Sequence, residues 1–249
     1  MISIFILILS LFAQAKLDLS YGTQGRSLPS FGAEFYADAG YNQLLWGKKQ
    51  TSKDILYGLV RPSIAPSTSF VINAIKAELE VFPISPIGFS VGRQIINSTF
   101  DFPFFKCEEV TCKGTYERNV VEGKMVLGFK GWIALGHYKV DTITSPRDDR
   151  PMADWRNVII GNPGREVQIE KKLLFGKLFE NKMAGILMEK VQFQGSKEYK
   201  ESFAAVYQVR KKDTSYMAGA GPFHTSQQGL GVIFYFRIHY LHTPSLKLF

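Results

Sequence analysis

The chain has 249 residues, a formal charge of +8 and a mean hydropathy of −0.04. No apolar run after the first fifteen residues approaches the roughly 20 residues that a membrane-spanning helix needs, which argues against a helical membrane protein. The basic excess suits anionic partners. The sequence contains no nucleic-acid-binding motif, so we expect no nucleic acid among those partners.

Residues 1–15, MISIFILILSLFAQA, predict a secretory signal peptide. An uncharged apolar run from Ile2 to Phe12 is followed by Ala13-Gln14-Ala15, the small-residue pattern of a cleavage site. We therefore expect the mature protein to begin at Lys16. The alternative is a buried N-terminal strand. Because the leader contains no charged side chain, its removal leaves the charge of +8 unchanged.

Apolar and polar residues then alternate in five stretches, which predict strands at residues 17–22, 31–46, 54–61, 68–82 and 87–97. A period of two places one row of side chains on each face of a sheet. In the first strand we expect Leu17, Leu19 and Tyr21 to face outward. In the third we expect the same of Ile55, Tyr57 and Leu59, with the segment PSIAPS ending that strand.

Two cysteines, Cys107 and Cys112, lie five positions apart in CEEVTC. In an exported chain, an even and closely spaced pair predicts one disulfide that closes a small loop. A structural zinc site uses four ligands, and no histidine lies near these two thiols. The sequence therefore predicts a stapled loop, with no metal site and no cofactor.

Beyond the cysteines, seven more strands are predicted at residues 115–129, 132–144, 165–178, 183–194, 199–210, 215–221 and 229–241. Residues 145–164 predict a long loop that could hold an extra short strand at 157–160. The last strand indicates the fold class. Val232, Phe234 and Phe236 belong to one apolar row in a strand far longer than the average of about 5–6 residues in soluble proteins. Such a strand is typical of a membrane-spanning β-strand, which needs about 9–11 residues.

Twelve strands, an even number, predict one antiparallel transmembrane β-barrel formed by residues 16–249. Barrels of 10 or 14 strands and a soluble β-sandwich are the alternatives. Connections alternate in length, so with both termini on the inner side the cysteine segment and residues 145–164 become outer loops. All eleven prolines fall outside the predicted strands, as ladder hydrogen bonding favours.

This pattern resembles bacterial outer-membrane β-barrel proteins over essentially the whole mature chain. The resemblance implies export to the outer membrane of a Gram-negative bacterium, with the lipid bilayer, lipopolysaccharide and the barrel assembly machinery as partners. Such barrels typically end in a Phe that closes the last alternating row. Here Phe249 is terminal, but Ser245 and Lys247 stand where apolar residues are expected. Either TPSLKLF is a tail beyond Tyr240, or the assembly signal is degenerate.

The inward rows of the predicted strands carry charges of both signs, which favours a small porin-like channel for small solutes or a structural barrel with a charged lumen. We expect no enzymatic activity from these residues. The predicted lumen-lining residues are Glu34, Asp38, Lys76, Glu78, Glu80, Arg118, Lys124, His137, Lys139, Asp141, Arg210 and Arg237.

An alternative function rests on His224 and Ser226 in the segment FHTSQQGL, which is predicted at the outer rim. The stretch resembles the His-x-Ser site of outer-membrane lipid A deacylases and, more loosely, that of outer-membrane phospholipase A. The resemblance implies a lipid hydrolase with His224 as base and Ser226 as nucleophile. No Asp, Glu or Asn follows between Gly229 and Phe249 to orient the imidazole, so the catalytic set is incomplete.

Overall fold

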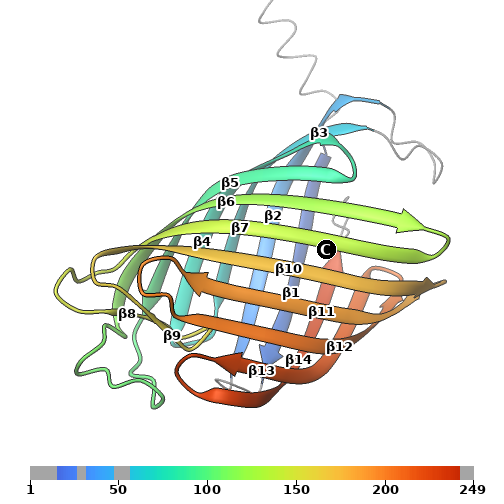
Figure 1. The fold of residues 1–249 in the computed structure, drawn as a ribbon. Helices are drawn as coiled ribbons and strands as arrows, with labels where there is room; N and C mark the ends of the chain where they lie inside the picture. Colours follow the sequence, from blue (N-terminus) through green and yellow to red (C-terminus); the bar gives the residue numbers. More distant parts are fainter. Residues whose placement is uncertain (1–15, 27–31, 48–56, 242–249) are drawn as a thin grey trace, which may run out of the picture.

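The computed structural model describes residues 16–26, 32–47 and 57–241, which form a closed antiparallel barrel of twelve strands (Figure 1). The expected leader, residues 1–15, and the C-terminal segment 242–249 lie outside the described residues. Within the described part of the chain no helix is long and apolar enough to cross a membrane. The prediction of a twelve-stranded barrel is confirmed, and the alternatives of 10 or 14 strands and of a two-sheet sandwich are wrong.

Each barrel strand pairs with its sequence neighbours, and β1 closes the ring against β14. The connection between β7 and β10 carries a separate two-stranded sheet of β8 (Met152–Asp154) and β9 (Ile159–Gly161) in place of the single short strand expected at 157–160. The barrel strands are β1 (Lys16–Arg26), β2 (Gly32–Trp46), β3 (Gly58–Thr68), β4 (Ile72–Ile84), β5 (Ile87–Ser98), β6 (Gly114–Phe129), β7 (Trp132–Thr144), β10 (Arg165–Phe179), β11 (Lys182–Phe193), β12 (Tyr199–Lys211), β13 (Thr214–Thr225) and β14 (Gly229–Leu241).

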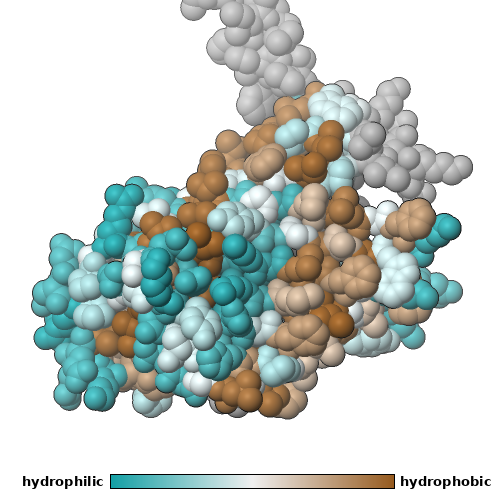
Figure 2. Space-filling model, in the orientation of Figure 1, coloured by the Kyte–Doolittle hydropathy of each residue, from teal (hydrophilic) through white to brown (hydrophobic). Residues whose placement is uncertain are grey.

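The outer surface of the barrel is apolar where a soluble protein would be polar. Outward side chains such as Leu17, Val121 and Phe234 are 67%, 58% and 56% exposed. On the face that Figure 2 shows, apolar side chains gather on the half of the barrel away from the β8–β9 connection, with hydrophilic side chains over the other end. An exterior apolar band with polar residues inside is the pattern of a lipid-facing barrel.

Strand β3 corrects the prediction for residues 54–61. Tyr57 and Leu59 are only 6% and 3% exposed and face inward, not outward, while Ile55 lies outside the described residues. The strand continues through Pro62 and Pro66, so PSIAPS does not end it. Register pairs with β2 are missing opposite both prolines, whereas the ladder to β4 is unbroken. Each proline therefore removes a hydrogen bond on one side only.

Two further prolines lie inside strands, contrary to the expectation that all eleven lie outside. Pro83 is near the end of β4, beside an irregularity in the β4–β5 register. Pro222 belongs to β13, which extends to Thr225 and not to residue 221 as expected. The β12–β13 pairs are again missing opposite this proline. A strand bonded on both sides tolerates the loss of one donor, so proline alone did not mark these boundaries.

One end of the barrel carries short turns and exposed aromatic side chains. Lys130 and Gly131 join β6 to β7 with positive φ angles of 47° and 83°, which suit a two-residue hairpin turn. Trp46 and Trp132 are both nearly half exposed at this end. The Trp46 indole nitrogen donates to the Pro83 carbonyl oxygen at 2.9 Å, and Trp132 stacks on Phe175. These aromatic residues form the girdle expected beside the short turns.

The opposite end carries a cap, defined as residues 99–113 and 145–164, the two longest connections that the structure describes. Apolar cap residues such as Trp155, Val158 and Ile159 pack on Tyr116 and other inward-facing side chains of β5, β6, β7 and β11. Val158 and Ile159 are fully buried. The cap therefore lies against the inner wall of the barrel and narrows its mouth.

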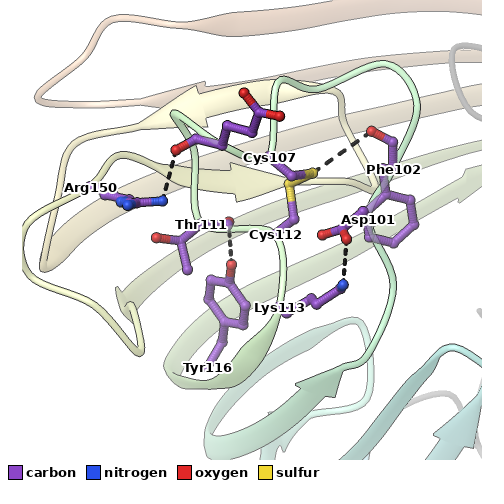
Figure 3. Close-up of a disulfide and its surroundings, with 9 residues drawn as sticks. Asp101, Phe102, Cys107, Thr111, Cys112, Lys113, Tyr116 and Arg150 are labelled. Carbon is purple, nitrogen blue, oxygen red and sulfur yellow. Dashed lines mark hydrogen bonds and ion pairs between the residues drawn. A yellow bond between two sulfur atoms is a disulfide. The ribbon is translucent and has the colours of Figure 1, made fainter.

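The predicted disulfide between Cys107 and Cys112 is confirmed in the first cap connection (Figure 3). Next to it, Thr111 joins the two halves of the cap. Its amide donates to the Pro151 carbonyl oxygen at 2.8 Å, and its own carbonyl oxygen accepts hydrogen bonds from the Ala153 amide and the Tyr116 hydroxyl. The disulfide thus staples a loop that backbone hydrogen bonds also hold.

Candidate functional site: the charged lumen

Arg61, on β3, organises the lumen side of the first four strands. Its guanidinium binds Asp18 on β1, with contacts of 2.9 to 3.1 Å, and Glu80 on β4 at 2.9 Å, and it also contacts Asp38 on β2. The Arg61 side chain is 3% exposed. A side chain at Gly40 would collide with this guanidinium, because an added Cβ would lie 2.3 Å from it. Glycine at position 40 therefore leaves room for Arg61.

Alternating acids and bases continue from Glu80 across the next strands. Lys124 on β6 lies 3.0 Å from Glu80 and 2.8 Å from Glu122. His137 on β7 lies 3.0 Å from Glu122. On the same strand, Lys139 lies 2.9 Å from Asp141 and 3.0 Å from Glu170 on β10. The charges therefore pair along single strands as well as between strands, and Lys124 reaches Glu80 across β5.

The series ends on β12. Lys172 contacts Glu170 and lies 3.1 Å from Glu189 on β11, which in turn lies 2.6 Å from Lys200 on β12. We call this series the ion-pair belt. β13 contains no Asp, Glu, Lys or Arg. The belt consists of Asp18, Asp38, Arg61, Glu80, Glu122, Lys124, His137, Lys139, Asp141, Glu170, Lys172, Glu189 and Lys200.

The cap is tied to the lumen by charge as well as by packing. Arg156 lies in the connection between β7 and β10, yet its guanidinium contacts Glu34 at 3.2 Å. Glu34 belongs to β2, on the opposite side of the ring of strands. This ion pair therefore crosses the lumen near its mouth.

Asp154 is the most buried charge of the cap, at 1% exposure. It accepts hydrogen bonds from the side-chain amides of Asn157 at 2.8 Å and Gln168 at 2.6 Å, and Arg118 lies 4.0 Å away. Burial by itself would raise the pKa of Asp154. The guanidinium of Arg118 and the two hydrogen bonds outweigh it, so the pKa of Asp154 lies below its ordinary value.

A cavity of about 300 Å³ remains in the lumen beside β1–β5 and β14. Its lining includes belt residues, Arg156 of the cap, and polar side chains such as Gln24 and Gln94. Arg237 also lines it, with its Nε donating to the Tyr36 hydroxyl at 3.0 Å. Within the described residues no carboxylate lies at ion-pair distance from Arg237, so this cation faces the cavity without an acidic partner.

The far side of the lumen is apolar near the short turns. Ile133, Leu135 and Met183 are buried together there, with Val126 and Leu174 packed against them. The cavity beside β1–β5 and β14 therefore lies across the lumen from this apolar cluster.

The twelve residues that the sequence predicts to line the lumen all lie at inward alternate positions of their strands. Arg210 differs from the others, because it lies at the exposed short-turn end and its Nε donates to the Lys212 carbonyl oxygen. Sequence reasoning missed other residues of the network. The alternation could have identified Asp18, Glu122, Glu170, Lys172, Glu189 and Lys200, but Arg61, Asp154 and Arg156 were hidden by a proline-rich segment and a long loop.

The chain is similar to known proteins in its structure but not in its sequence. No family model matches the chain, and no curated protein is similar to it in sequence. An outer-membrane channel from Pseudomonas putida F1 aligns over 91% of this chain and 95% of its own, with a TM-score of 0.50 and 9% identity. The fold is that of a bacterial outer-membrane β-barrel.

Other outer-membrane barrels align less closely. The β domain of the Bordetella autotransporter BrkA has a TM-score of 0.45 at 10% identity and covers 91% of this chain and 98% of its own. The translocator domain of the autotransporter NalP from Neisseria meningitidis has a TM-score of 0.37 at 9% identity, covering 96% and 93%.

The alternative catalytic pair of the outer-membrane barrel is not assembled in this structure. The Ser226 hydroxyl donates to Glu198 and accepts from the Tyr199 amide at 3.0 Å. His224 faces outward on β13 with its ring 5.5 Å from that of Tyr199, and no hydrogen bond joins it to Ser226 in the described part of the chain. The acid beside the hydroxyl is Glu198, and it contacts the serine and not the imidazole. The His224 imidazole is therefore not positioned to activate Ser226 in the part of the chain that the structure describes.

Proposed function

We propose that the protein is an integral outer-membrane barrel that forms a narrow, capped channel for small polar solutes. The exterior apolar band, the aromatic girdle beside the short turns and the polar interior support membrane insertion with the cap on the outer side. Export with removal of residues 1–15 belongs to the same proposal.

The lumen cavity is the observation that carries the channel proposal. The ion-pair belt fixes charged side chains against the wall, and the apolar cluster fills the far side, so the free volume follows β1–β5 and β14. At its outer end this volume meets Arg156, whose ion pair with Glu34 crosses the mouth. Arg237 places on the wall a positive charge that no carboxylate of the described residues pairs. A solute would therefore pass one constriction at the cap and one cation within the lumen.

Planar bilayer recordings test the channel. We expect small, discrete conductance steps from the purified protein. Arg156→Gln should enlarge the steps because the cross-lumen ion pair is lost, and Arg237→Gln should shift the ion selectivity towards cations. Arg93→Gln is the matched control, since Arg93 is exposed on the outer face of β5 and pairs with Glu117 at 2.6 Å. A silent protein, or steps that respond equally to all three substitutions, would contradict the channel and favour a purely structural barrel.

A further inference from the structure

An exterior groove of about 480 Å³ lies across β10–β14, near the cap end of the barrel. Its floor includes the exposed apolar side chains Leu173, Met188, Phe203 and Leu230. At its edge, two lysines interrupt the apolar outward rows. Lys171 on β10 and Lys190 on β11 are direct cross-strand partners and face the same side.

Two like charges opposite each other on a sheet are unfavourable, and a basic side chain on the outer face of a lipid-facing barrel is costly as well. Lys190 is partly compensated, because Glu201 lies 2.6 Å away. Lys171 contacts only the ring of Tyr138, at 5.8 Å, and no carboxylate reaches it among the residues that the structure describes. The site therefore carries one more positive charge than the protein itself compensates.

The surroundings indicate which anion fits. Lys190 also lies 5.7 Å from the ring of Tyr199, and His224 and Glu201 extend a polar edge beside the two lysines. A ligand that fills the groove must combine phosphate, for the ammonium groups, with acyl chains for the apolar floor and hydroxyl groups for the polar edge. The position near the cap end places it in the outer leaflet, so this inference rests on the membrane orientation proposed above.

We propose that this groove binds a phosphorylated glycolipid of the outer leaflet, with its phosphate bridging Lys171 and Lys190 and one acyl chain on Leu173, Met188 and Phe203. The phosphate relieves the repulsion between the two lysines. The bound lipid leaves the lumen untouched, so it is a site separate from the channel.

Native mass spectrometry of the detergent-purified full chain, titrated with diphosphoryl lipid A, tests the site. We expect Lys171→Gln and Lys190→Gln each to weaken binding about tenfold, as for the loss of one charge-assisted contact. Lys177→Gln is the matched control and should bind as the unaltered protein does. Lys177 lies on the same outward row of β10 and also contacts aromatic rings, 5.7 Å from Trp132, but at the short-turn end.

Lipid A without phosphate should bind at least tenfold more weakly to the unaltered protein. The proposal is overturned if Lys177→Gln weakens binding as much as the other two, if the dephosphorylated lipid binds equally well, or if phosphatidylglycerol binds as tightly as lipid A. A lipid-free dimer that dissociates in the Lys171 and Lys190 variants would also overturn it, because the groove would then be an interface between copies. The conductance of these variants is measured in a separate experiment. If the protein forms no channel, the lipid-binding measurement therefore still tests the groove.

Discussion

Arg61 shows how one buried cation fixes several strands. It contacts carboxylates on β1, β2 and β4 while lying on β3, so its removal takes one cationic partner from each of three acids, of which Glu80 keeps Lys124 at 3.0 Å. Breaking a buried ion pair from one side costs far more than breaking an exposed pair, because the remaining charge is buried and uncompensated.

We therefore expect Arg61→Gln to lower the free energy of unfolding by about 3–5 kcal/mol. Arg93→Gln, which removes an exposed pair on the outer face, should cost less than about 1 kcal/mol. Urea unfolding of the barrel in lipid vesicles measures both. Equal midpoints for the two variants would contradict a structural role for the Arg61 cluster.

A substitution at Ser226 distinguishes the channel from the alternative function as a lipid hydrolase. Its hydroxyl bonds to Glu198 and to the backbone of Tyr199, so we expect Ser226→Ala to loosen the β13–β14 connection by about 1 kcal/mol. We expect no release of fatty acid from lipopolysaccharide or phospholipid by either protein. Release by the unaltered chain that Ser226→Ala abolishes would establish the hydrolase instead.

Among the elements, the cap joins packing and charge most closely. Trp155 packs on Tyr116, with ring centroids 5.0 Å apart, and its neighbour Asp154 is held by Arg118, Asn157 and Gln168. The pKa of Asp154 is lower in the folded cap than in the unfolded chain, where it is about 3.9. Its stabilising contribution is therefore complete above that value and is lost as the pH falls through the lower, folded pKa.

We expect acidification below about pH 4 to loosen the cap. With Trp46 and Trp132 replaced by Phe, the emission of Trp155 should shift to the red as the pH falls below about 4. Asp154→Asn in the same background should show a smaller pH dependence. A red shift on acidification that is as large with Asn at position 154 as with Asp would contradict the proposed role of Asp154.

The disulfide closes only a short ring, so its effect on the unfolded chain is about 2 kcal/mol at most. Thr111 and Ala153 hold the same loop through backbone hydrogen bonds. We expect reduction to leave the difference in gel mobility between boiled and unboiled protein intact. Loss of that difference on reduction alone would show that the barrel depends on the disulfide.

The strands differ in how well the sequence predicts them. β7 and β14 agree at both ends with residues 132–144 and 229–241, because an uninterrupted alternation is bounded by turn residues. For β3 the predicted strand end and the predicted faces are both wrong. Pro62 and Pro66 predict a turn, which ends the expected strand at Arg61 and reverses its faces relative to the structure. A lone sequence does not reveal that the neighbouring strand β4 keeps its ladder intact.

The sequence predicts that charged side chains line the lumen, but it does not predict which of them form ion pairs. Alternation identifies Lys124 and Lys139 as inward residues, since each lies in a regular strand. Glu122, on the same strand as Lys124, follows from the alternation, but the contact of Lys124 with Glu80 on β4 depends on the register between strands, which no local pattern specifies. Arg156 depends on how a 20-residue loop folds, and its contact with Glu34 joins positions 122 residues apart.

At the scale of the whole molecule, the exposed apolar band predicts firm membrane association. We expect the mature chain to stay with the outer-membrane fraction after carbonate washing and to migrate faster on gels when it is not boiled. Release by salt or carbonate, with no mobility difference on boiling, would contradict membrane insertion.

The ion-pair belt also bears on how the barrel is assembled. Shifting a β-strand by one residue moves every side chain to the opposite face. A slipped β10 would turn Glu170 and Lys172 towards the acyl chains, and a basic residue at the bilayer midplane costs about 2–4 kcal/mol. Nine of the barrel strands contribute to the belt, so almost any slip during insertion carries such a penalty. The charges that line the interior therefore favour the correct register of these strands over a one-residue slip while the barrel closes.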